Sequence, residues 1–174
     1  MGMDTINNLP AHPLLVHGSV VLIPLTALLL VLCAAWPAMG HRISWLLPAL
    51  AVVALVCVLL TTDSGEWLEE RVPETALMEE HAEMGENLTP WAVGLLIGAL
   101  LVWLVDLLRS SKAEPSGPGS SSGAVRVALS LPVRIAVSVI AVVLAAGSVV
   151  ETYWIGDSGA KAVWENRVSP HSGD

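Results

Sequence analysis

The sequence predicts an all-α membrane protein, a bundle of four transmembrane helices that forms a single domain over residues 1–174. Three observations support this fold class. Hydrophobic residues make up 54% of the chain and charged residues only 14%, against roughly 25% charged residues in soluble domains. The mean hydropathy is +0.68. Four apolar runs follow one another along the chain, and a helix of about 20 such residues crosses a bilayer. An ordinary soluble domain is therefore excluded.

The four spans are expected at about residues 14–36, 43–61, 90–108 and 134–154. The first two lie in runs without a charged residue, and most of the third lies in another such run, from Leu88 to Val105. The fourth run is shorter, but Arg134 at its start can extend toward water, and Tyr153 and Trp154 at its end suit a membrane interface. We expect the first run to be retained rather than cleaved as a secretory signal, because no Lys or Arg precedes it and its apolar core is too long.

The distribution of basic residues predicts the orientation. Five Lys or Arg residues lie on one side of the membrane, either between spans one and two or near the segment that joins spans three and four. Three lie on the other side. Because Lys and Arg are enriched in cytoplasmic loops, both termini are expected outside the cell membrane. Most of the carboxylates, and with them the net charge of -8, then belong to the outer surface. The chain has no basic patch for nucleic acid, which leaves the lipid bilayer, another membrane protein or a second copy as partners.

Polar segments complete the predicted fold. Residues 110–123, SSKAEPSGPGSSSG, have too few apolar residues to fold and are predicted to form a flexible cytoplasmic linker. Residues 63–89 are predicted to form an acidic outer stem, with a helix that starts near Thr75 and leads into the third span. After the fourth span, Gly156 is expected to end the helix and Asp157 to cap a short C-terminal interfacial helix.

The stem has a two-sided pattern. Several of its residues share one stripe at spacings of three and four on a helix, namely Leu77, Met78, His81, Met84, Gly85 and Leu88. Its glutamates fall on the other side, where a solvated face is the simplest interpretation. His81 is therefore expected to face inward.

Ionisable side chains are predicted to gather at one end of the bundle. Because the spans alternate in direction, His12 and His17 at the start of the first span meet His81 before the third and Asp157 after the fourth. Such groups in or near membrane spans are costly and are functional candidates by default. The simpler explanation is structural, because a histidine at a helix start can donate to a carbonyl or cap the first turn.

Haem b is one cofactor that these residues could hold. It needs two axial side chains on facing helices. His17 and His81 are the candidate pair, with His12 or Met84 as substitutes. His12 and His17 are five residues apart and do not share a helical face, so each of the two helices supplies one histidine.

A divalent metal is the other cofactor considered. Three histidines would bind it together with a carboxylate from Asp63, Glu80 or Asp157. The chain has no HxxxH or HExxH motif, so every ligand must come from a different element.

The sequence carries no sign of catalysis. It has no nucleophile elbow, no glycine-rich phosphate loop and no CxxC motif, and no internal repeat is apparent. Because no nucleophile, base and oxyanion grouping can be assembled, an enzyme is not expected. The sequence predicts a non-catalytic membrane subunit or scaffold with an outward cluster of histidines and carboxylates. The alternative is a haem- or metal-binding redox protein built around His17 and His81.

Four stretches of the chain resemble one protein family. They are LPAHPLLVHGSVVLIPLTALLL from residue 9, TTDSGEWLEERV from 61, EHAEMGENLTPWAVG from 80 and VVETYWIGDSGAKAVW from 149. Together they are similar to DUF2231, a family of bacterial four-helix membrane proteins of uncharacterised activity. The resemblance covers nearly the whole chain except the linker. It implies that histidines of the first span and third helix occur together with a glycine-rich tail, in which relatives often have a histidine where this chain has Asp157.

Overall fold

The computed structural model describes residues 5–36, 40, 42–113 and 130–165. In these residues it contains four long helices and one shorter helix, which are α1 (His12–Ala35), α3 (Leu46–Glu69), α4 (Ala76–Glu86), α5 (Leu88–Ala113) and α7 (Leu131–Trp164). Helices α1, α3 and α7, and α5 taken together with α4, are long and apolar enough to cross a membrane. The predicted all-helical fold with four spans is confirmed.

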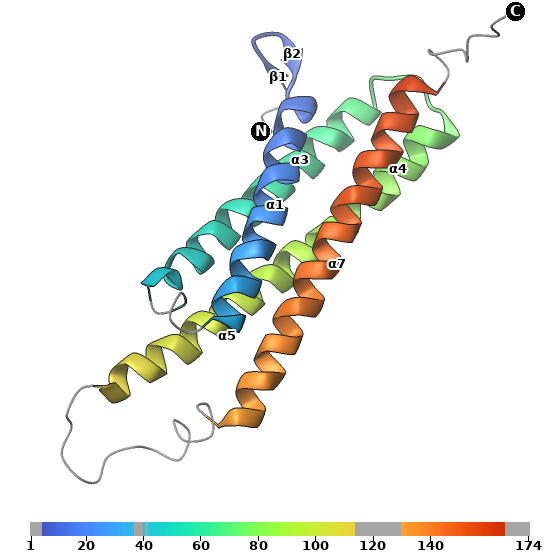
Figure 1. The fold of residues 1–174 in the computed structure, drawn as a ribbon. Coiled ribbons are helices and arrows are strands. Elements are labelled where there is room, and N and C mark those ends of the chain that lie inside the picture. The colour runs from blue at the N-terminus through green and yellow to red at the C-terminus, as the bar shows by residue number, and fades with distance from the viewer. Residues whose placement is uncertain (1–4, 37–39, 41, 114–129, 166–174) are drawn as a thin grey trace, which may run out of the picture.

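The four long helices pack as a ring in which α1 contacts α3, α3 contacts α5, α5 contacts α7 and α7 returns to α1. The start of α1 and the end of α7 lie at the same end of the bundle (Figure 1). We call this the terminal end, and we call the opposite end, where α1 and α5 finish and α3 and α7 begin, the loop end. Helix α4 lies at the terminal end and packs chiefly against α7.

A small hairpin precedes α1. Strand β1 (Thr5–Ile6) pairs antiparallel with β2 (Leu9–Pro10), and the turn between them is formed by Asn7 and Asn8, with φ of 52° and 64°. Positive φ at both central residues is the pattern of a type I′ turn, which Asn tolerates better than most residues. Strands of two residues leave no periodic signal, so the hairpin was not expected from the sequence.

Small side chains fill much of the bundle interior. Among the described residues of the four long helices, seven alanines are almost fully buried, Ala27, Ala51, Ala54, Ala92, Ala99, Ala141 and Ala145. Small residues allow helix backbones to approach closely where lipid gives no hydrophobic drive for association. Helices α5 and α7 are in tight contact at Gly147, where an added Cβ atom would lie 2.0 Å from the ring of Trp91.

The segment predicted as an outer stem consists of separate helical pieces. Helix α3 continues to Glu69, and α4 begins after Thr75, whose hydroxyl oxygen accepts a hydrogen bond from the Met78 N–H over 3.3 Å. A turn at Asn87 separates α4 from α5. Pro90 lies in the first turn of α5, where the missing N–H has no helical partner to lose.

Helix α7 differs from the prediction. It runs without a break from Leu131 to Trp164, so the expected separate interfacial helix is not formed. Asp157 does not cap a new helix but pairs with Lys161 one turn later, at 2.7 Å. A glycine within a helix costs only about 1 kcal/mol relative to alanine, and Gly156 therefore does not end α7. Helix α5 likewise extends to Ala113, so residues 110–113 of the predicted linker are helical. Residues 114–123 lie outside the described residues.

Candidate functional site

Two histidines from different helices meet at the terminal end of the bundle. The ring centroids of His12 and His81 are 6.3 Å apart, and the ring planes make an angle of 79°. His12 is the first residue of α1, and His81 lies in the middle of α4. Both side chains are half-buried. We call these two residues the histidine pair.

The ring of His12 is held by α3. Its Nδ1 lies 2.9 Å from the carbonyl oxygen of Thr61. A carbonyl can only accept, so Nδ1 carries the proton and Nε2 of the neutral ring is left as an acceptor. The absence of a side chain at Gly65 makes room for this ring, because a Cβ atom there would lie 3.0 Å from both Nδ1 and Cε1 of His12.

The ring of His81 is held in the same way by α7. Its Nδ1 lies 2.9 Å from the hydroxyl oxygen of Ser158, and that hydroxyl donates its own hydrogen to the Ile155 carbonyl over 2.9 Å. The Ser158 oxygen therefore accepts from Nδ1 of His81, and Nε2 is again the free acceptor. A Cβ atom on Gly159 would lie 2.9 Å from Cε1 of His81.

An Asp-Ser-Gly triplet lies beside each histidine, at residues 63–65 next to His12 and at residues 157–159 next to His81. In each triplet the serine donates to the carbonyl three residues earlier, Ser64 to Thr61 over 3.0 Å and Ser158 to Ile155. The Thr61 carbonyl is also the partner of His12, whereas Nδ1 of His81 is bonded to the Ser158 hydroxyl itself. The two halves of the site are therefore similar but not identical. A repeat of three residues is too short to stand out in the sequence, and this feature was missed there.

His17 does not belong to the histidine pair. Its side chain is exposed, and its Nδ1 is bonded to the carbonyl of Pro13 one turn earlier in α1. Five residues correspond to about 140° of rotation around a helix, so His12 and His17 cannot both face α4. The contact with His81 that the sequence assigned to His17 is made by His12.

The other candidate ligands are spread over the terminal end. Met84 lines a cavity of about 240 Å³ between α4 and α7, which also reaches Ser158. Asp63, Glu80 and Asp157 are exposed. In the part of the chain that the structure describes, no group of three or more His, Cys, Asp and Glu residues could hold a metal ion. The expected shell of three histidines and a carboxylate is therefore not assembled there.

Burial and charge act together on His81. Helix α4 lies outside the apolar part of the third span, and the pKa of His81 is lowered from its ordinary value. The larger cause is burial, which disfavours the charged ring, and the second is repulsion from His12. The bond to the Ile155 carbonyl acts in the opposite direction. His81 is therefore held mainly as a neutral imidazole near neutral pH.

An acidic surface covers the terminal end of the bundle, where the histidine pair lies. Its exposed carboxylates, which we call the acidic cap, belong to Asp63, Glu66, Glu70, Glu74, Glu79, Glu80, Glu83, Glu86, Asp157 and Glu165. Two ion pairs are formed among the described residues, Arg71 with Glu70 and Lys161 with Asp157. Most of the negative charge of the acidic cap therefore faces outward from the bundle.

A comparison with curated proteins found no match, and neither did one with solved structures. The sequence profile of one family, described as predicted membrane protein (DUF2231), matches residues 8–171. The matched region contains the histidine pair, both Asp-Ser-Gly triplets and all four spans. Since the match covers nearly the whole chain, this protein belongs to the DUF2231 family of predicted membrane proteins.

Proposed function

We propose that the protein is a non-catalytic membrane subunit that presents its acidic cap to a partner with a basic surface. The observation that carries this proposal is the two-sided structure of α4. Its glutamates Glu79, Glu80, Glu83 and Glu86 are exposed, while Leu77, Met78, His81 and Met84 on the other side are half-buried. Complementary charge steers association between proteins and selects between partners.

The histidine pair serves this function by fixing the position of α4. His81 connects α4 to α7, and His12 connects the start of α1 to α3. Because the two rings are in contact, the start of α1 and its partner α3 are also connected to α4 and α7. A helix of 11 residues is marginal by itself in water, so these contacts determine how its acidic face is presented.

Photo-crosslinking tests this proposal in native membranes. A crosslinking amino acid at Glu83, on the exposed face of α4, should give a discrete product of higher mass. The same amino acid at the lipid-exposed Val139 of α7 is the matched control and should not give that product. The triple variant E79K/E83K/E86K, with the crosslinker at Glu80, should abolish the product. Persistence of the same product after this charge reversal would count against a basic partner.

We also propose that the terminal end faces outside the cell. Arg42, Arg109 and Arg134 lie at the loop end and Arg71 and Lys161 at the terminal end, which agrees in direction with the enrichment of basic residues in the cytoplasm. A reporter fused after Asp174 should be accessible only from outside. A cysteine introduced at the exposed Arg42 should react only after the membrane is permeabilised, and the reverse result would contradict this orientation.

The histidine pair also supports a second candidate function, binding of a metal ion or haem iron. In metal sites a ligating histidine usually donates its other N–H to a carbonyl or similar acceptor, which fixes the ring. Both His12 and His81 have such a bond at Nδ1, which leaves Nε2 as the ligating atom of each ring. This is the redox alternative of the sequence, with His12 in the place of His17.

A visible spectrum and a metal analysis of the purified protein test this second function. A Soret band that shifts on reduction, or one metal ion per chain, should be lost in His12→Ala and in His81→Ala. It should persist in His17→Ala, which is the matched control because His17 lies outside the pair. A colourless, metal-free sample prepared from haem- and metal-supplemented cells would leave the subunit function as the better explanation.

A further inference from the structure

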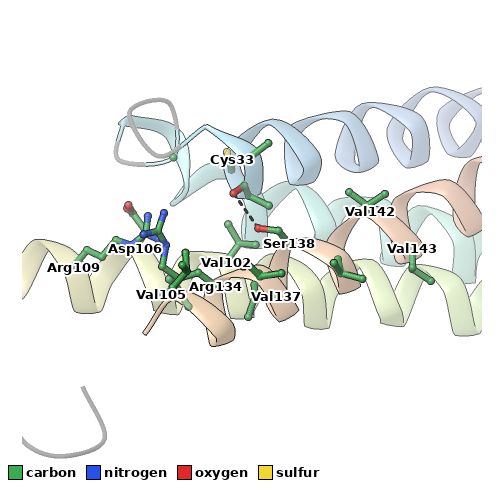
Figure 2. A pocket seen from close by; sticks show the side chains of 16 residues that line it. Cys33, Val102, Val105, Asp106, Arg109, Arg134, Val137, Ser138, Val142 and Val143 are labelled. Atoms are coloured by element: carbon green, nitrogen blue, oxygen red, sulfur yellow. Dashed lines mark hydrogen bonds between the residues drawn. The ribbon is translucent and has the colours of Figure 1, made fainter. Parts of the chain in front are cut away.

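A second cavity lies at the loop end, far from the histidine pair. It has a volume of about 430 Å³ and lies between α1, α5 and α7, within the range of about 300–1,000 Å³ that is usual for ligand sites. Figure 2 shows that its two ends differ in character. Asp106, Arg109 and Arg134 lie together at one end, and valines such as Val137 and Val142 line the remainder.

The charged end of the cavity is positive. Arg109 from α5 and Arg134 from α7 are close enough for their charges to repel each other. Asp106 is the one carboxylate among the described residues of the lining, and its Oδ2 accepts a hydrogen bond from Ser44 over 2.7 Å. Two guanidinium groups and one carboxylate leave a positive charge at one end of a largely apolar cavity.

A buried donor at this end has no hydrogen-bond partner among the residues that the structure describes. Among the described residues, Nε of Arg134 is the buried side-chain polar atom without a hydrogen bond. Such atoms are uncommon in folded proteins, and each calls for an explanation. A guanidinium that repels its neighbour and retains an unused donor is suited to an anionic group, and the planar donor arrangement of arginine matches the oxygens of a phosphate.

We infer that this cavity binds an anionic phospholipid, with the phosphate on Arg109 and Arg134 and part of an acyl chain along the valines. The position of the cavity supports a lipid as the occupant. Arg109 and Arg134 flank the apolar runs of the third and fourth spans, which is the depth at which headgroups lie. Basic pockets between transmembrane helices are sites for anionic lipid headgroups. The lining is otherwise largely apolar, which a free phosphate ion would not require.

The test uses the purified full chain in a neutral detergent. Its thermal unfolding is followed during titration with short-chain phosphatidylglycerol, phosphatidylcholine of the same chain length, or inorganic phosphate. A ligand that binds only the folded state raises the unfolding temperature. We expect a saturable rise with phosphatidylglycerol, a smaller one with phosphatidylcholine and none with phosphate. Native mass spectrometry should then show one retained phosphatidylglycerol per chain.

Variants connect the effect to the cavity. In R109Q/R134Q the apparent affinity for phosphatidylglycerol should fall at least tenfold. Arg42→Gln is the matched control, because Arg42 is exposed at the same end and does not line the cavity, and it should bind as the unmodified protein does. Val137→Phe narrows the apolar part while it keeps both arginines, and it should also weaken binding.

Three results would overturn the proposal. One is equal stabilisation of the unmodified protein by phosphatidylglycerol and phosphatidylcholine. This comparison can be made even if the variants do not fold. Another is equal stabilisation by inorganic phosphate, which would show an anion site without a lipid. The third is undiminished binding of phosphatidylglycerol by a folded R109Q/R134Q variant.

Discussion

His81 and Ser158, which are 77 positions apart in the sequence, are joined by a hydrogen bond of 2.9 Å between Nδ1 and Oγ. The bond connects the middle of α4 to the C-terminal part of α7. Its donor is a group whose protonation changes near physiological pH. The attachment of the acidic cap to the bundle is thus linked to the charge of one imidazole.

The first prediction concerns acid. In the unfolded chain His81 titrates near its ordinary pKa of about 6.5, and in the folded protein its pKa is lower. Between these two values the unfolded chain binds more protons, so the free energy of unfolding should fall as the pH drops below about 6.5 and should level off below the folded pKa. Chemical unfolding in detergent at several pH values measures this.

Two variants are the controls for the acid effect. His81→Gln removes the titrating group and should flatten the dependence on pH in this window. His17→Gln, which changes an exposed histidine outside the pair, should keep it. A pH dependence that survives in His81→Gln would assign the effect to other groups.

The second prediction concerns the glycine beneath His81. Gly159→Ala would place a Cβ atom 2.9 Å from Cε1 of the ring, so the ring or α7 must shift, and overpacking of this kind costs about 1–3 kcal/mol. Gly156→Ala is the control on the same helix, because nothing lies within 4 Å of its Cβ position. It should stabilise the protein by up to about 1 kcal/mol, since alanine is the better helix former. Unfolding of both variants in one detergent makes the comparison, and a Gly159→Ala protein as stable as Gly156→Ala would contradict the packing.

The third prediction concerns the contact between α5 and α7. A Cβ atom on Gly147 would lie 2.0 Å from the ring of Trp91. Gly147→Ala should therefore destabilise the protein by about 1–3 kcal/mol or prevent folding. Because the clash needs the indole, the change should cost much less when it is made together with Trp91→Leu. A double-mutant cycle measures this coupling, and additive effects would show that the two residues do not touch.

The fourth prediction concerns Ser44 at the loop end. Its side chain is buried at 4% exposure and donates to Asp106 over 2.7 Å. Ser44→Ala should destabilise the protein by about 1–3 kcal/mol, because it removes a donor from a carboxylate. Ser138→Ala, which loses a longer bond of 3.3 Å to the Ala34 carbonyl, should cost less. Equal unfolding midpoints of the two variants would argue against a special role for the bond to Asp106.

The spans and the inward face of the stem could be predicted because each depends on one segment at a time. A charge-free run of sufficient length determines a spanning helix. The spacing of Met78, His81 and Met84 determines one face of α4, and these side chains are half-buried while Glu79 and Glu83 are exposed. Neither inference needs the position of another helix.

The histidine pair and the loop-end cavity could not be predicted in the same way. Which of His12 and His17 meets His81 depends on how α1 is rotated against α4, and local spacing shows only that one of them must face away. Arg109 and Arg134 belong to different spans, so their proximity depends on how α5 and α7 are aligned lengthwise. The predicted helix end at Gly156 was wrong, because a helix that packs against a neighbouring helix tolerates one glycine.

The unbroken course of α7 has a mechanical consequence. Its 34 residues extend about 51 Å, whereas the hydrocarbon core of a bilayer is about 30 Å thick. About 20 Å of the helix therefore extends beyond the hydrocarbon core. Because a helix responds to bilayer thickness partly by tilting, a tilt of about 10° would swing a projecting tip of about 20 Å sideways by roughly 3–4 Å. Because Ser158 binds α4 to α7, α4 would move with this helix. The distance of the acidic cap from the lipid, and its tilt, would then depend on the thickness of the membrane.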